Sequence, residues 1–357
     1  MSVSESQIPQ SAEEKTPEDV DAPQAGEHLP PIKPPTAGFV LQLFFIPMII
    51  VAIIVMVWLM FSWLAHMGSN PQDLVDGILK ANAKSWQDAE RLAEMLRDPS
   101  QQSLKKDTAL ARKLSEALGK LLDAKHSDEN TVNLRVYLCK VLGEFEVPDG
   151  YPVLLRAATQ QNHDADIDVR RSALESIALL ARTNRQRFQS DEKLMGVLRD
   201  AVFTRGGGDK KTRRREAKLR ERAAFALGVI GGRPALDVLS QVLTDPQPNP
   251  RYNATTGLAR HGDSRAIPML IEMLDADNEF ADVGEAKEPA QQWKRLTVLN
   301  NGIQATRLFI EQNSAADRSG LKLALQKLIE SDMPKLKSSL HRSLRMKAKE
   351  VMILMKS

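Results

Sequence analysis

The sequence contains too few cysteines and aromatic residues for several common classes of protein. Cys139 is the one cysteine among 357 residues, so no disulfide can form within the chain and cysteine usage does not indicate a compartment. Aromatic residues make up 5% of the chain, which argues against β-sandwiches and barrels, because their strands are rich in such residues. Cys139 lies among apolar residues at helical spacing, and we expect a buried thiol that packs as a small hydrophobe.

Motifs for catalysis or metal binding are missing as well. None of the six histidines precedes a glutamate, and no pair of histidine and carboxylate recurs at helical spacing, so we expect no metal site. Gly206-Gly207-Gly208 lacks the lysine and hydroxyl residue of a phosphate-binding loop and is typical of a flexible loop. His261 lies in a predicted turn, where we expect a solvated imidazole. We therefore assign no catalytic, cofactor-binding or metal-binding residue, and predict that the protein is not an enzyme.

Charged residues are also missing between Lys33 and Asp73, and residues 38–66 form a predicted transmembrane helix. A bilayer core requires about 20 apolar residues, and residues 43–65 supply 23, of which 14 are Leu, Ile, Phe or Val. Pro47 is expected in the first turns, where its missing N–H costs little, and a kink of the helix is the alternative. A cleaved signal peptide and a buried soluble helix are the alternatives, but the segment is longer than a signal sequence and follows an acidic stretch. The flanking lysines leave the orientation undetermined.

Residues 1–37 form a predicted disordered tail that is acidic and rich in proline. The tail carries 2 basic and 7 acidic side chains, whereas the chain after residue 66 carries 47 basic and 39 acidic ones. Few apolar residues are available to offset the entropy of ordering this segment. Residues 31–34 fit the pattern PxxP, which docks into aromatic grooves, although a plain spacer explains the same prolines.

The chain repeats a pattern built on four arginines. They are Arg135, Arg170, Arg220 and Arg251, at spacings of 35, 50 and 31 residues. Seven residues after each stands a large apolar residue: Leu142, Ile177, Leu227 and Leu258. Eight residues after each stands a small one: Gly143, Ala178, Gly228 and Ala259. These offsets place the apolar residues on one helical face, and the small ones allow a neighbouring helix to approach closely. We expect the arginines to pair with acidic residues of adjacent repeats, with Asp166, Asp168 and Asp245 as candidates.

A turn and a second apolar helix follow in register, so the repeated unit is a pair of helices. The segments VRRSALESIALLA, LRERAAFALGVIGGRPALDVLSQVLTD and RYNATTGLARHGDSRAIPMLIEMLD resemble HEAT repeats, in particular the short HEAT-like repeats of phycobilisome lyases. The resemblance implies an all-α fold, an armadillo/HEAT-type α-solenoid of stacked helix pairs preceded by one transmembrane helix. We assign residues 70–357 to this repeat domain, with the clearest repeats at 130–275. The anchor followed by repeats also resembles bacterial membrane proteins with HEAT domains, which implies the bacterial cytoplasmic membrane.

A basic run interrupts the repeats, and we treat residues 204–218 as an insertion. Its cations form a candidate surface for an anionic partner: Lys210, Lys211, Arg213, Arg214, Arg215 and Lys218. Such a patch contacts lipid phosphates or nucleic acid, but it lacks the aromatic residues that stack on bases. A solvated loop and helix start is the first interpretation of this run, and a partner surface is the alternative, for which we expect lipid rather than nucleic acid.

The final predicted helix, residues 333–356, carries leucines at four-residue steps and many basic residues. It is expected to cap the solenoid, with a helix lying on the membrane surface as the alternative.

The leading functional prediction is a non-catalytic, membrane-anchored scaffold that binds an unidentified protein partner and requires no cofactor. The alternative is a HEAT-like enzyme related to bilin lyases or deoxyhypusine hydroxylase, an oxidoreductase whose family motif of His-Glu pairs is missing here.

Overall fold

The structure is a computed structural model that describes residues 36–66, 70–124, 128–183, 185–333, 336 and 338–355. It divides into two units, Met1–Gly68 and Ser69–Ser357, which are treated separately below. Of the predicted tail, residues 1–35 lie outside the described residues, and so does the PxxP pattern at 31–34.

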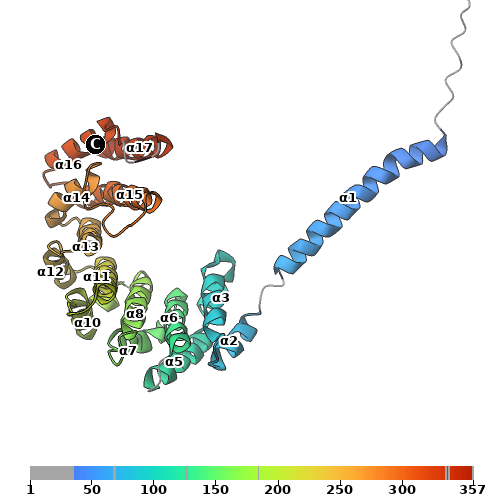
Figure 1. Ribbon diagram of the computed structural model, residues 1–357, viewed down its shortest axis with the longest axis horizontal. Helices are drawn as coiled ribbons and strands as arrows, with labels where there is room; N and C mark the ends of the chain where they lie inside the picture. The colour runs from blue at the N-terminus through green and yellow to red at the C-terminus, as the bar shows by residue number, and fades with distance from the viewer. Residues whose placement is uncertain are drawn as a thin grey trace, which may run out of the picture. The chain divides into compact units, whose positions relative to one another are not determined.

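The first unit contains α1, a single helix that runs from Ala37 to His66 (Figure 1). Its apolar stretch Ala37–Ser62 has a mean hydropathy of 3.0, which is long and apolar enough to cross a membrane, and none of that stretch is buried within the protein. The prediction for Pro47 was wrong, since α1 begins ten residues before it and Pro47 lies inside the helix. The carbonyl four residues earlier therefore lacks its usual N–H partner, and a kink at this point is expected.

The described residues of the second unit form helices and no strand. Long helices make up one row, and Figure 1 shows them following one another along the stack. They are α3 (Ser85–Arg97), α6 (Glu129–Glu144), α8 (Asp166–Ala181), α11 (Lys210–Ile230), α13 (Pro248–Arg260), α15 (Glu288–Gln312) and α17 (Ser338–Leu354). Each of these helices packs against the next one in the row. We call this set the long-helix row.

The other helices, most of them shorter, pair with the long-helix row and make up a second row. They are α2 (Pro71–Leu79), α5 (Thr108–Asp123), α7 (Tyr151–Ala158), α10 (Glu192–Val202), α12 (Arg233–Val242), α14 (Ile267–Leu274) and α16 (Ser319–Glu330). Short pieces join the pairs: α4 (Gln102–Lys105), α9 (Arg185–Gln189) and the 3₁₀ turns η1 (Pro99–Gln101), η2 (Pro148–Gly150) and η3 (Ser264–Ala266). The second unit is an α-solenoid of stacked helix pairs, as the sequence predicted.

Aspartates begin several of these helices. Asp107, Asp128, Asp191 and Asp209 each accept a hydrogen bond from a backbone N–H in the first turn of the helix that follows. Such a cap satisfies one of the donors that a helix start leaves free, and typically contributes about 1 kcal/mol.

The apolar residues of the repeat form one continuous seam. Leu142, Ile177, Leu227 and Leu258 are each 0% exposed, which confirms the interior position predicted for them. One core cluster of buried side chains extends from Leu74 in α2 to Val351 in α17. No helix pair could bury this surface alone, so stacking of neighbours is what stabilises the pairs.

Small residues set the distance between helices of the long-helix row. A Cβ added to Gly143 would lie 2.7 Å from the Cβ of Ser176, which joins α6 to α8. A Cβ added to Gly228 would lie 2.6 Å from the Cα of Gly257, which joins α11 to α13. The predicted close approach is confirmed at both places.

The spacing of 50 residues has a different cause from the predicted insertion. Helices α9 and α10 occupy residues 185–202, and α11 already begins at Lys210. Within the predicted insertion 204–218, only residues 204–209 lack helical structure. Residues 210–218 are therefore the first turns of a long helix rather than an inserted loop.

The C-terminal helix packs against α15 and α16, as the predicted cap should. It begins later than predicted, at Ser338, and Met333 before it adopts a left-handed backbone with φ of 44°. Leu344, Ala348 and Val351 are buried, whereas Met346 and Ile353 are exposed on its other face.

Candidate interaction surfaces

The repeated arginines bind the ends of the preceding short helices. Arg135 donates to Leu121 O, Arg170 to Ala158 O, Arg220 to Thr204 O and Arg251 to Asp245 O, at 2.6–3.2 Å. Those carbonyls follow or end the shorter helices, where the helix dipole leaves partial negative charge. A fifth arginine on α15 repeats the contact, since Arg295 donates to Ala276 O and Asn278 O.

Carboxylates supplement this pattern and do not define it. Arg220 binds both carboxylate oxygens of Asp245, at 2.7 and 3.1 Å, and Arg135 lies 3.6 Å from Asp166. The prediction for Asp168 was wrong, because it pairs with Arg171 and Arg215 instead of a repeat arginine. The arginines are therefore structural, and their shared partner is a backbone carbonyl, which no sequence spacing reveals.

Polar side chains connect successive members of the long-helix row. Tyr137 of α6 donates to Glu90 of α3 at 2.7 Å, and its ring stacks on Trp86. Further links join neighbouring helices of the row: Arg97 with Glu144, Arg215 with Asp168, Arg222 with Glu175, and Asn249 with Glu221. The row thus presents a polar surface whose charges are largely paired from helix to helix.

The predicted basic surface lies on the first turns of α11, but two of its six cations serve the fold. Arg215 is half-buried and pairs with Asp168 at 3.3 Å, and Arg213 donates to Gly208 O at 2.5 Å, which closes the glycine loop. The remaining members have no ion pair in the described part of the chain and are exposed: Lys210, Lys211, Arg214 and Lys218. We call these four the free α11 cations.

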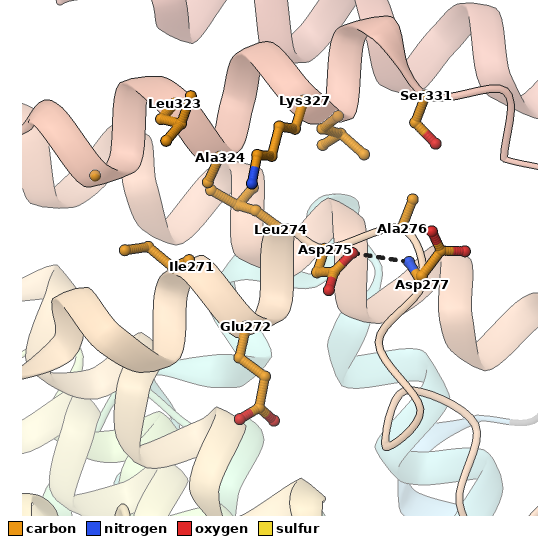
Figure 2. A pocket seen from close by; sticks show the side chains of 12 residues that line it. Ile271, Glu272, Leu274, Asp275, Ala276, Asp277, Leu323, Ala324, Lys327 and Ser331 are labelled. Atoms are coloured by element: carbon orange, nitrogen blue, oxygen red, sulfur yellow. Dashed lines mark hydrogen bonds between the residues drawn. The ribbon is translucent and has the colours of Figure 1, made fainter.

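A groove of about 410 Å³ opens between α14 and α16 (Figure 2). Ile271 and Leu274 line it from one side, and Leu323 and Ala324 from the other. The charged residues Lys327, Asp275 and Asp277 line it as well.

Two of the apolar residues that line this groove are exposed to solvent. Ile271 is 36% and Leu323 54% exposed. Sequence analysis missed the groove, because both residues continue an apolar helical pattern and only the spacing between two helices uncovers them.

Residues 211–286 match the family model described as HEAT repeats. This stretch covers α11, α12, α13 and α14, whose arginine contacts and buried seam are described above. Residues 211–286 are HEAT repeats. The match includes the Gly228–Gly257 contact and most of the free α11 cations.

Solved structures with a similar course of the chain include other helical proteins. Human deoxyhypusine hydroxylase is 17% identical, with 79% of this chain and 97% of that chain covered and a TM-score of 0.31. An engineered protein is 14% identical, with 80% and 68% covered and a TM-score of 0.38. The protein YibA of Escherichia coli is 17% identical, with 79% and 97% covered and a TM-score of 0.29. No curated protein matches the sequence.

The cysteine of the second unit lies in a packed position. Cys139 is buried, and burial raises the pKa of its thiol, so the thiolate that would react is disfavoured. Among the described residues, no group of three or more His, Cys, Asp and Glu side chains is placed to hold a metal ion.

His261 is a packed residue of the HEAT repeats, and the prediction of a solvated imidazole was wrong. Its Nε2 lies 3.0 Å from Gly228 O at the end of α11. A Cβ added to Gly231 would lie 2.3 Å from the imidazole, so only a residue without a side chain leaves room for the ring here. The positive φ of 68° at this position also favours glycine. Burial lowers the pKa of His261, the hydrogen bond to Gly228 opposes that change, and Arg185 and Arg260 reinforce it.

We expect the stability of the second unit to fall in mildly acidic solution because of His261. The unfolded chain takes up the proton as the pH falls through about 6.5, whereas the folded histidine resists it down to its lower pKa. The stabilisation is therefore complete above pH 6.5 and decreases as the pH falls through that window, by about 1 kcal/mol or less. Urea unfolding at pH 7.5 and 5.5 measures the difference. His261→Gln retains a donor for Gly228 O and should reduce that difference, and an unchanged difference would contradict the assignment.

Proposed function

We propose that the protein is a membrane-anchored scaffold without catalytic activity, which presents its α-solenoid to protein partners. The observation that carries the proposal is the contrast between the two units. Helix α1 leaves a long apolar surface uncovered, whereas the long-helix row presents a continuous polar surface of the kind that repeat proteins use for binding.

The apolar surface of α1 supports the membrane anchor. Phe44 is 69%, Ile54 61% and Met56 69% exposed, and apolar surface of this extent is stable in lipid and not in water. The 14 Leu, Ile, Phe and Val residues of 43–65 favour insertion by about 4–8 kcal/mol. The resemblance to bacterial anchored HEAT proteins supports the bacterial cytoplasmic membrane as the location.

The free α11 cations support a contact with anionic lipid. Each lysine or arginine near an anionic bilayer surface contributes about 1 kcal/mol of attraction, and these four are not neutralised by carboxylates in the described residues. Nucleic acid is disfavoured, because exposed aromatic side chains do not alternate with these cations.

Charges placed in the middle of α1 should release the protein from membranes. Lysine at mid-helix opposes insertion by about 2.5–3.5 kcal/mol, so Ile50→Lys/Ile54→Lys offsets most of the apolar gain. We expect the parent chain to remain in the membrane pellet after carbonate washing and the variant to appear in the supernatant. The matched control Leu323→Lys/Met346→Lys, with both changes at exposed positions of the solenoid, should remain in the pellet.

Two results would count against the proposal. A parent chain that carbonate extracts is not anchored by α1, and a mature protein whose N-terminus lies after residue 66 shows that the segment is a signal sequence. Turnover of a substrate by the purified chain would contradict the non-catalytic part.

A further inference from the structure

Three arginines, at the end of α8, the start of α9 and the end of α13, have no carboxylate partner within the described residues. Arg182 caps the end of α8, Arg185 begins α9, and Arg260 ends α13. None of the three guanidinium groups has an ion pair or a hydrogen bond to protein within the described residues. Burial lowers the pKa of Arg260, and the charges that act in the same direction are those of Arg185 and Arg182.

Contacts around the last turn of α11 bring these segments together. Gln189 of α9 donates to Ile230 O at 2.7 Å, and His261 lies 3.0 Å from Gly228 O. A Cβ added to Gly228 would lie 3.8 Å from Nη1 of Arg260. Helix α9 and the end of α13 therefore flank the same turn, with Arg185 on one segment and Arg260 on the other.

Arg182 and Arg260 lie at helix C-termini, which explains how these two cations are tolerated. Backbone carbonyls at the C-terminus of a helix carry partial negative charge, which favours nearby cations by about 0.3–1 kcal/mol. This attraction stabilises these two arginines and leaves their N–H donors unused. The repeat arginines differ, because Arg220 and Arg295 bind carbonyls and carboxylates with the same groups.

We propose that Arg182, Arg185 and Arg260 form a binding site for a terminal phosphoryl group. A guanidinium fork binds two oxygens at once, so forks that approach from two segments require an anion with at least three free oxygens. A phosphate monoester or a diphosphate offers that number, whereas a carboxylate and a phosphodiester each offer two.

Titration of the full chain in neutral detergent at pH 7.5 and low salt tests the site. The two probes are pyrophosphate, which represents a soluble ligand, and short-chain phosphatidic acid, which represents a lipid headgroup. Short-chain phosphatidylcholine, a phosphodiester, serves as the negative probe. We expect saturable binding of at least one phosphoryl probe, with a Kd below about 1 mM.

Single arginine variants identify the residues that bind. Arg185→Met and Arg260→Met should each weaken binding by about tenfold or more, because each removes a charge-assisted fork. Arg185 is exposed at a helix start, so its variant should fold, and circular dichroism checks both. The control Lys211→Met/Arg214→Met removes two exposed cations from the other end of α11 and should leave the Kd within about twofold.

The outcomes separate the proposal from simple attraction between charges. Tighter binding of pyrophosphate supports a soluble phosphorylated ligand, and tighter binding of phosphatidic acid supports a lipid headgroup. Absence of binding by both probes overturns the site, and so does binding that survives in a folded Arg185→Met variant or that weakens equally in the control.

Discussion

Replacing Gly228 by valine should lower the free energy of unfolding of the repeat unit by about 3 kcal/mol or more. The obstacle is backbone, since the new Cβ would lie 2.6 Å from the Cα of Gly257 and no rotamer can relieve that overlap. Overfilling a core typically costs about 1–3 kcal/mol when side chains can move. Helices α11 and α13 must separate here, so we expect a loss at or above the upper end of that range.

The shape of the unfolding curve should change as well. Stability in a solenoid is the sum of unit stabilities and nearest-neighbour interfaces. A weakened interface between α11 and α13 therefore allows the two ends of the stack to unfold separately, and urea unfolding followed by helical circular dichroism should show two transitions.

Gly196 offers a matched control elsewhere in the second unit. It lies inside α10, and nothing lies within 4 Å of the position a Cβ would take. Gly196→Ala should raise stability by up to about 1 kcal/mol, through helix propensity and a less flexible unfolded chain. If Gly228→Val unfolds at the same urea concentration as the parent, the close contact of α11 with α13 is not what positions these helices.

Removing the guanidinium of Arg220 should cost about 3–5 kcal/mol of stability. The side chains of Arg220 and Asp245 are 5% and 2% exposed, so Arg220→Met leaves a buried carboxylate without its bidentate partner. The nearest replacement is Arg205, 4.0 Å from Asp245 and 58% exposed, which favours the lower end of the range. Thr204 O loses its donor in the same variant.

Two further variants show whether the loss arises from an unpaired charge. Arg220→Met/Asp245→Leu removes both charges and should recover part of the stability, because a buried pair can be replaced by apolar groups at lower cost than it can be broken. The exposed pair of Arg233 and Asp237, 4.0 Å apart, is the control, and Arg233→Met should change stability by less than about 0.5 kcal/mol. Equal losses in the single and double variants would contradict the buried-charge explanation.

Much of the repeat unit could be predicted, because its determinants are local in sequence. The arginine alignment and the apolar residue seven positions later identify one face of each long helix, and packing buries that face in every repeat. The free α11 cations could be found from composition, but the roles of Arg213 and Arg215 could not. Their partners, Gly208 O and Asp168, come from a loop and from the preceding long helix.

Other features escaped the sequence because they depend on how helices end and stack. The carbonyls that bind the repeat arginines appear in no side-chain pattern, and His261 is packed only because Gly231 leaves room for its ring. The groove beside Ile271 and Leu323 requires a certain spacing between α14 and α16. The arginines at the ends of α8, α9 and α13 are separated by up to 78 residues in the chain, from 182 to 260.

The sequence alone determined the apolar length of α1, the helical periodicity of the repeats and the residues that form their interior seam, because each follows from side-chain chemistry at short spacing. The tertiary structure decided which charges are neutralised, which surfaces remain open and which arginines meet. Pairing, burial and exposure are properties of neighbours in space, and in a stacked array those neighbours come from different repeats.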